Sequence, residues 1–210
     1  MAKKKYLPDF YVPTAEEVKK FIVRPYSDNP LVGNKKDDAL FKLFRDLIPE
    51  NKNIQDIIIK CSTLNALAST NVIEIQYIAE HILMLNIDER LKRGDLSLVD
   101  DIGKKINVGN SKQRSHYSFA SKYCCFHQPQ LYSIYDHYVA LVLMELQERD
   151  KFGDFKHGGL KKYECYMKAL EDFRKHYGLP ENEFSKKDLD KYLWLFGKEC
   201  VSEYNIRINK

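Results

Sequence analysis

Apolar residues recur at three- and four-residue spacing along nearly the whole chain, whereas two-residue alternation is almost absent. The first spacing places apolar side chains on one face of a helix, and the second would place them on one face of a strand. Nine glycines and seven prolines are few for 210 residues, which disfavours a turn-rich all-β fold. The sequence therefore predicts an all-α protein.

Turn and capping residues divide this pattern into nine or ten helices. Thr14 can cap the first helix, and Asn53 can open the third. Asn71 and Glu74 have the spacing of a capping box, and segment 25–34 is rich in loop-forming residues. We expect helices at about residues 15–23, 36–47, 54–68, 72–85, 88–94, 96–106, 113–126, 134–148, 160–177 and 186–203.

Composition indicates one compact globular domain, with two lobes as an option. The hydrophobic fraction is 44%, with 14 tyrosines and 11 phenylalanines, which is ample for a core. In the two-lobe option, the central helices at about 54–110 form one lobe, and the N- and C-terminal helices form the other. No apolar run is long enough to span a membrane, and the N-terminus lacks the apolar region of a signal peptide.

Cysteine and histidine usage predicts a reduced cytoplasmic protein without a metal. The five cysteines form no CxxC pair and do not cluster with histidines at zinc spacing. His116, His127 and His137 fall in one region, but no pair has the i, i+4 spacing of a helical metal site. We expect no metal, no cofactor and no membrane partner.

The segment 117–139 has the most specific pattern in the chain. Ser118 precedes Asp136 by 18 positions, and a short link containing Pro129 separates the two expected helices. Ser133 and Asp136 have capping-box spacing, with Ser133 as the N-cap and Asp136 at the third helical position, so Asp136 can serve a capping role. A carboxylate at a helix N-terminus is also held in its charged form by the helix dipole, as a catalytic role would require.

This segment resembles the helix-hairpin-helix base-excision DNA glycosylases. Ser118-Phe-Ala120 matches the family's Lys or Ser followed by x-Ala, and 134–139 approximates its apolar-x-x-Asp-x-x-apolar phrase. Upstream, 65–72 resembles the family's Ser-x-Gln-x-Thr-Asp stretch, which ends one helix and opens the next. The resemblance covers roughly residues 54–146 and implies a two-lobed helical fold that acts on DNA.

The resemblance implies Asp136 and Ser118 as the catalytic residues of a monofunctional enzyme. Ser118 stands where the lyase members carry lysine, and Schiff-base chemistry needs an amine. The DNA-gripping hairpin would fall on 112–116, which has no glycine, and the four-cysteine iron–sulfur loop of some members is absent. No carboxylate lies near Leu64 or Asn65, where adenine-removing members place a second acid.

Basic and aromatic residues around this segment complete the expected site. The stretch 104–122 carries lysines and an arginine but no acidic residue. Such a positively charged stretch suits phosphate binding. Base flipping requires side chains that stack on or contact the extruded base. The expected DNA-binding residues are Lys104, Lys105, Lys112, Arg114, His116 and Lys122, and the expected base-pocket residues are Tyr117, Phe126, His127 and Tyr135.

Two other interpretations remain open. The same scaffold can serve as a DNA-binding module without catalysis, with Asp136 acting as a cap. The chain can also be a helical protein–protein interaction domain whose basic patch meets an acidic partner, with Trp194 in the contact.

Overall fold

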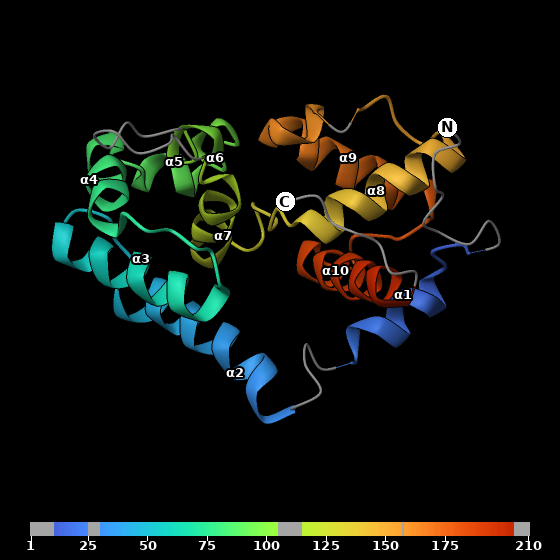
Figure 1. The fold of residues 1–210 in the computed structure, drawn as a ribbon, viewed down its shortest axis with the longest axis horizontal. Coiled ribbons are helices and arrows are strands. Elements are labelled where there is room, and N and C mark those ends of the chain that lie inside the picture. The colour runs from blue at the N-terminus through green and yellow to red at the C-terminus, as the bar shows by residue number, and fades with distance from the viewer. Residues whose placement is uncertain (1–10, 25–29, 105–114, 157, 204–210) are drawn as a thin grey trace. The chain divides into compact units, whose positions relative to one another are not determined.

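The computed structural model describes residues 11–24, 30–104, 115–156 and 158–203 (Figure 1). These residues form ten α-helices, one π-helical segment and one short 3-10 helix, and they contain no strand. The prediction of an all-α fold is confirmed. No helix in this described part has the length and apolarity needed to span a membrane.

The chain divides into two compact units. The central unit is Ser27–Ile134, and the terminal unit combines Met1–Tyr26 with Tyr135–Lys210. The central unit extends further at both ends than the expected central lobe at 54–110, because the helices on either side pack against that lobe's helices.

The central unit is built around α3, which contacts α2, α4 and α7 (Figure 1). Its core includes Phe44, Ile57, Leu64 and Ile78, all fully buried. Its elements are α2 (Pro30–Phe41), the π-helical segment η1 (Lys42–Leu47), α3 (Ile54–Ala68), α4 (Ile75–Leu85), α5 (Asp88–Lys92), α6 (Ser97–Ile102) and α7 (Tyr117–His127).

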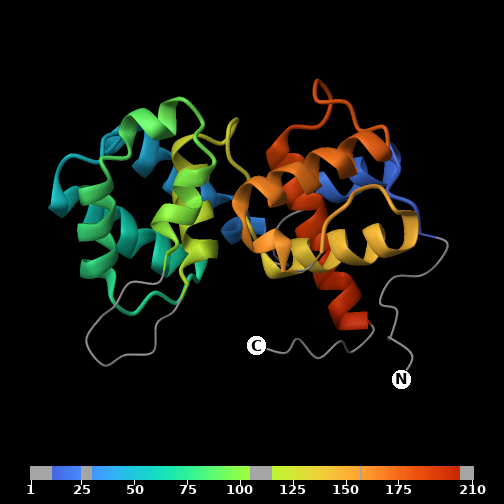
Figure 2. The ribbon, with the colours of Figure 1, turned by 90° about the horizontal axis from the view of Figure 1, so that it is seen from above.

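The terminal unit is organised by α10, which packs against both α1 and α8 (Figure 2). Aromatic rings fill the contact between α10 and α1, where Phe21 meets Tyr192 edge-on at a centroid distance of 5.4 Å and Tyr192 stacks on Phe196 at 5.9 Å. The elements of this unit are α1 (Ala15–Ile22), α8 (His137–Asp150), the 3-10 helix η2 (Gly159–Lys161), α9 (Tyr163–His176) and α10 (Lys186–Glu203).

Two helices with a local capping signal, α1 and α3, begin where the sequence places them. Thr14 caps α1 by accepting the Glu17 backbone N–H at 3.2 Å. Asn53 caps α3 by accepting the Gln55 backbone N–H at 2.8 Å. Both side chains bind N–H groups that the first turn of a helix leaves unsatisfied.

Several expected boundaries in the central unit are wrong. The expected loop at 25–34 gives way to helix from Pro30, a residue that suits a first helical position. Helix α4 begins at Ile75 and not at residue 72, because Asn65 binds the Val72 backbone N–H at 2.9 Å and holds the preceding loop. Helix α6 ends at Ile102.

The boundaries around segment 117–139 also differ from the expectation. Helix α7 begins at Tyr117 and not at residue 113, and residues 113 and 114 lie outside the described part of the chain. Helix α8 begins at His137 and not at residue 134. The single helix expected at 160–177 is a 3-10 turn followed by α9, because Lys162 between them is extended.

Candidate functional site

Asp136 is the N-cap of α8. Its backbone is extended, with φ −130° and ψ 150°, and its Oδ1 accepts the Tyr138 backbone N–H at 2.8 Å. Its Oδ2 accepts no hydrogen bond from the described residues. The expectation that Ser133 caps this helix, with Asp136 at its third position, is wrong, because the chain turns helical only after Asp136.

Ser118 is the second residue of α7 and is partly exposed. It belongs to the central unit, whereas Asp136 belongs to the terminal unit, and the junction between the units falls after Ile134. Its backbone carbonyl accepts the Ser121 hydroxyl at 3.0 Å. The two proposed catalytic residues therefore lie at the beginnings of two helices, one in each unit.

The expected basic residues fall into two groups. Lys105, Lys112 and Arg114 lie outside the described residues. Among the rest, Lys104 forms an exposed ion pair with Asp101, and His116 donates its backbone N–H to the Gly103 carbonyl at 3.1 Å. Lys122 is partly buried and donates from Nζ to the Ala68 carbonyl at 3.1 Å. This last contact satisfies a carbonyl at the end of α3.

Within the central unit, the Lys122 contact joins α7, which carries the Ser118-Phe-Ala120 motif, to the segment 65–72. Asn65 organises the loop after α3, since its Oδ1 accepts the Thr70 hydroxyl at 2.8 Å and its Nδ2 donates to the Val72 carbonyl at 2.9 Å. Ser69 and Asn71 in that loop have left-handed backbones, with φ 49° and φ 55°. The C-terminal end of α3, from which this loop starts, is thus held against α7 by Lys122, one turn from Ser118.

The expected base-pocket residues differ in accessibility. Tyr117 and Tyr135 are partly exposed, and the Tyr135 ring meets the Tyr166 ring edge-on at 5.2 Å. Phe126 and His127 are buried, with 2% and 6% of their surfaces exposed. Phe126 packs on the Phe41 ring at 4.9 Å. Only the two tyrosines present surface that a ligand can reach.

The most connected polar cluster was missed by the sequence analysis. Lys60 of α3 is fully buried, and its Nζ donates to the Glu50 carbonyl at 2.9 Å and to Asn51 Oδ1 at 2.5 Å. A third contact, of 3.2 Å, joins Nζ to Nε2 of His127. The three acceptors match the three N–H bonds of an ammonium group.

Asn51 links this ammonium to its surroundings. Its Oδ1 also accepts the Tyr123 hydroxyl at 2.6 Å, and its Nδ2 donates to Asp88 Oδ1 at 2.7 Å. Phe44 and Tyr123 place ring centroids 5.7 Å and 5.6 Å from the Lys60 Nζ atom, within cation–π range. We call Asn51, Lys60, Asp88, Tyr123 and His127 the lysine network.

Burial sets the ionisation of the lysine network. It lowers the pKa of Lys60 to about 8, although the charge of Asp88 opposes the change. Burial, helped by the Lys60 charge, also lowers the pKa of His127 well below its usual range. Because the network has no exposed amine or imidazole, it fixes the packing of α3, α5 and α7 and offers no open catalytic site.

The terminal unit has an open pocket, but its charges are paired. Arg149 binds Asp150 through two contacts of 2.6 Å, and Tyr177 donates its hydroxyl to the same carboxylate. These contacts, that of Arg149 first, lower the pKa of Asp150. The lining residues are Val12, Pro13, Thr14, Ala15, Arg149, Asp150, His176 and Tyr177. No group of three His, Cys, Asp or Glu residues in the described ranges has the geometry to hold a metal ion.

Comparison with known proteins places the chain in a family. A sequence profile described as the HI_0787 N-terminal domain matches residues 17–131, more than half of the chain. The chain belongs to the HI_0787 N-terminal domain family. An uncharacterized protein of Haemophilus influenzae is 41% identical over 147 residues, which cover 70% of this chain and 68% of that protein. No solved structure matches the chain.

The family match bears directly on the central unit. It spans α2 to α7 and therefore includes the whole lysine network and Ser118. Asp136 lies beyond its end.

Proposed function

We propose that the chain binds DNA and hydrolyses the N-glycosidic bond of a damaged base without a lyase step. The observation that carries the proposal is the geometry of Asp136. One of its carboxylate oxygens is fixed by the Tyr138 N–H, and the other accepts no hydrogen bond from the described residues. The carboxylate is therefore held in a fixed orientation at the N-terminus of the 14-residue helix α8.

The reaction follows from a carboxylate placed beside the sugar of an extruded nucleotide. As the C1′–N bond lengthens, positive charge develops on the sugar ring, and Asp136 stabilises it. Water then forms the new C1′–O bond and passes a proton to the carboxylate. The base leaves with the electron pair of the broken bond and takes up a proton. Ser118 has no amine, so no Schiff base forms with the sugar.

In this proposal, basic residues contact the phosphates of the nucleic acid and an aromatic residue contacts the base. Lys104, His116 and Lys122 flank the start of α7, and a phosphate would compete with their present intramolecular partners. Tyr135, which precedes Asp136 in the chain, contacts the extruded base. Phe126 and His127 are enclosed in the core, so the proposal gives them no base contact. All five cysteines are free thiols, which suits a cytoplasmic location.

The test is release of a base from duplexes that each contain one damaged or mismatched base. The wild-type protein should create abasic sites that break only after alkali treatment, because hydrolysis without a lyase step leaves the strand intact. Asp136→Asn should abolish release. Asp188→Asn is the matched control, since Asp188 binds the Ser185 backbone N–H at 2.9 Å beside the N-terminus of α10. Release by Asp136→Asn at the wild-type rate would refute the proposal.

An inactive DNA-binding module on the same scaffold is the second candidate. It is favoured by the intramolecular partners of Lys104 and Lys122 and by the absence of glycine from 112–116. It predicts salt-sensitive binding of intact and damaged duplexes with equal affinity.

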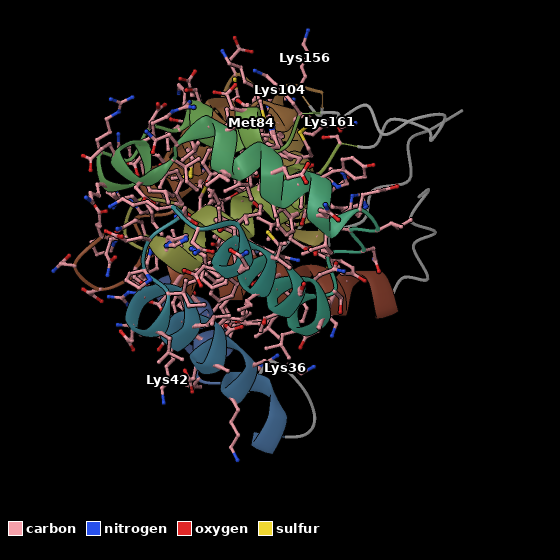
Figure 3. The ribbon with its side chains drawn as sticks, turned by 90° about the vertical axis from the view of Figure 1, so that its left-hand side faces the viewer. Lys36, Lys42, Met84, Lys104, Lys156 and Lys161 are labelled. Carbon is pink, nitrogen blue, oxygen red and sulfur yellow. The ribbon has the colours of Figure 1, made fainter. Side chains whose placement is uncertain are left out.

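A protein-interaction domain is favoured by exposed apolar residues on and beside α4. Ile73, Tyr77 and Met84 are 71%, 49% and 83% exposed, and Figure 3 labels Met84 on the outer side of α4. The seven-residue spacing of Tyr77 and Met84 places these two side chains on one face of α4, and Ile73 lies in the loop just before the helix. Absence of DNA binding at low salt would favour this candidate over the other two.

A further inference from the structure

The loop that joins α8 to α9 concentrates lysines without ion-pair partners. Lys151, Lys156 and Lys161 are exposed, and none of them forms a hydrogen bond or ion pair through its side chain with the described residues. Lys156 points away from the ribbon in Figure 3. Asp154 is the one acidic residue between Lys151 and Tyr163 in the sequence. We call the three lysines the lysine surface.

Several other lysines of the terminal unit are neutralised by ion pairs. Lys168 pairs with Asp172 at 2.6 Å, and Lys175 pairs with Glu171 at 3.2 Å. Lys19 pairs with Glu183 at 3.0 Å. The lysine surface therefore differs from these ion-paired lysines of the same unit.

Both ends of this loop are anchored to the unit. Gln147 Nε2 donates to the Gly153 carbonyl at 2.7 Å at the start of the loop, and Leu160 is fully buried at its end. Between these anchors, Gly158 and Gly159 have open space where a side chain would begin. The backbone there can approach a phosphate closely.

We infer that the lysine surface contacts the phosphates of the duplex that flanks the extruded nucleotide. This inference rests on the proposed function. Three ammonium groups without ion-pair partners lie on one chain connection that also contains an open glycine pair. These features suit the backbone of a polyanion, because its condensed counterions are released when lysines bind. An acidic protein segment carries negative charge as well. Binding to duplex DNA distinguishes the two, because a surface that serves only an acidic protein need not bind DNA.

The length of α8 sets the distance at which these contacts form. Asp136 caps the start of α8, and Lys151 follows its last residue. At 1.5 Å per residue, this 14-residue helix is about 21 Å long. At about 3.4 Å per base pair, a duplex that runs along α8 meets the lysine surface roughly six base pairs from the extruded nucleotide.

The experiment measures binding of full-length protein to labelled duplexes over a range of salt concentrations. Each duplex carries an abasic-site analogue. The long duplex has flanks of about ten base pairs on both sides of the analogue. Two shortened duplexes have a flank of about four base pairs on one side, each on a different side. The variant is Lys156→Gln with Lys161→Gln. The control is Lys168→Gln with Lys175→Gln, which removes the same charge from ion-paired positions.

On the long duplex, log affinity falls with log salt, and the variant should make this fall less steep by about 0.9 per lysine removed. The control should leave it unchanged, and one of the two shortened duplexes should lose the difference. Equal slopes for variant and wild type, with an analogue preference that depends on Asp136, would overturn this inference and leave the proposed function intact. Lack of any DNA binding would overturn both.

Discussion

The Nζ atom of Lys60 lies 3.2 Å from Nε2 of His127, and Asn51 Nδ2 lies 3.3 Å from the same nitrogen. Both neighbours are N–H donors, so Nε2 of His127 must be the acceptor. His127 is therefore neutral, with its proton on Nδ1, in agreement with a pKa lowered by burial and by the Lys60 charge. The lysine network thus joins an ammonium to a neutral imidazole inside the central unit.

Removal of the ammonium should destabilise the central unit. Lys60→Met leaves Glu50 O, Asn51 Oδ1 and His127 Nε2 without their shared donor. We expect a loss of about 2–4 kcal/mol in the free energy of unfolding, measured by urea denaturation. Lys52→Met is the control, because Lys52 is exposed and its ion pair with Glu50 is on the surface. Its effect should stay within about 0.5 kcal/mol. Equal effects of the two variants would contradict this account.

The same lysine should give stability a specific pH dependence. The pKa of Lys60 is about 8 in the folded protein and 10.5 for an ordinary lysine. Between these values the unfolded chain binds more protons, so the Lys60 contribution to the free energy of unfolding rises with pH. The difference between wild type and Lys60→Met should therefore increase from pH 8 to 10.5 and be flat below pH 8. A difference that falls over this range would show that folding raises this pKa.

Substitutions at Asp136 should separate capping from chemistry. Asparagine is as good an N-cap as aspartate, so Asp136→Asn should change the free energy of unfolding by only a few tenths of a kcal/mol. Asp136→Ala removes the acceptor for the Tyr138 N–H and should cost about 1 kcal/mol. Base release should be lost in both variants. Thermal melts with activity assays make the comparison, and activity that follows stability would identify Asp136 as a cap alone.

Gly197 should be intolerant of a side chain. A Cβ atom there would lie 2.9 Å from both the Cβ and the carbonyl oxygen of Tyr138, in the first turn of α8. Gly197→Ala should therefore cost about 1–3 kcal/mol through overpacking. Gly159→Ala meets open space and serves as the control, with an expected change near zero. Tolerance of alanine at Gly197 would mean that α8 and α10 are less closely packed than described.

The features that the sequence predicts correctly depend on neighbouring residues. Thr14 and Asn53 cap helices through contacts two or three residues away, and such signals are visible in a linear pattern. The start of α4 was misplaced because Asn65, seven residues before Val72, binds the backbone that the capping box was expected to organise. Asp136 was placed at the right helix end, but at its third position and not at its cap.

The lysine network depends on contacts that no local pattern contains. Lys60 and His127 are separated by 67 residues, and their contact requires the packing of α3 against α7. One signal was nevertheless present in the sequence. Lys60 falls between the core positions Ile57 and Leu64 on one helix face, so a lysine interrupts an otherwise apolar stripe. A charged residue at such a position needs buried partners.

The most direct test of the proposed chemistry is binding to a duplex that carries an abasic-site or oxocarbenium-mimicking nucleotide. Intact duplex is the comparison, and each is measured at two salt concentrations with wild type and Asp136→Asn. Tighter binding of the analogue by wild type, lost in Asp136→Asn, is the result that the account predicts. Equal binding of analogue and intact duplex by both proteins would contradict a glycosylase site at Asp136.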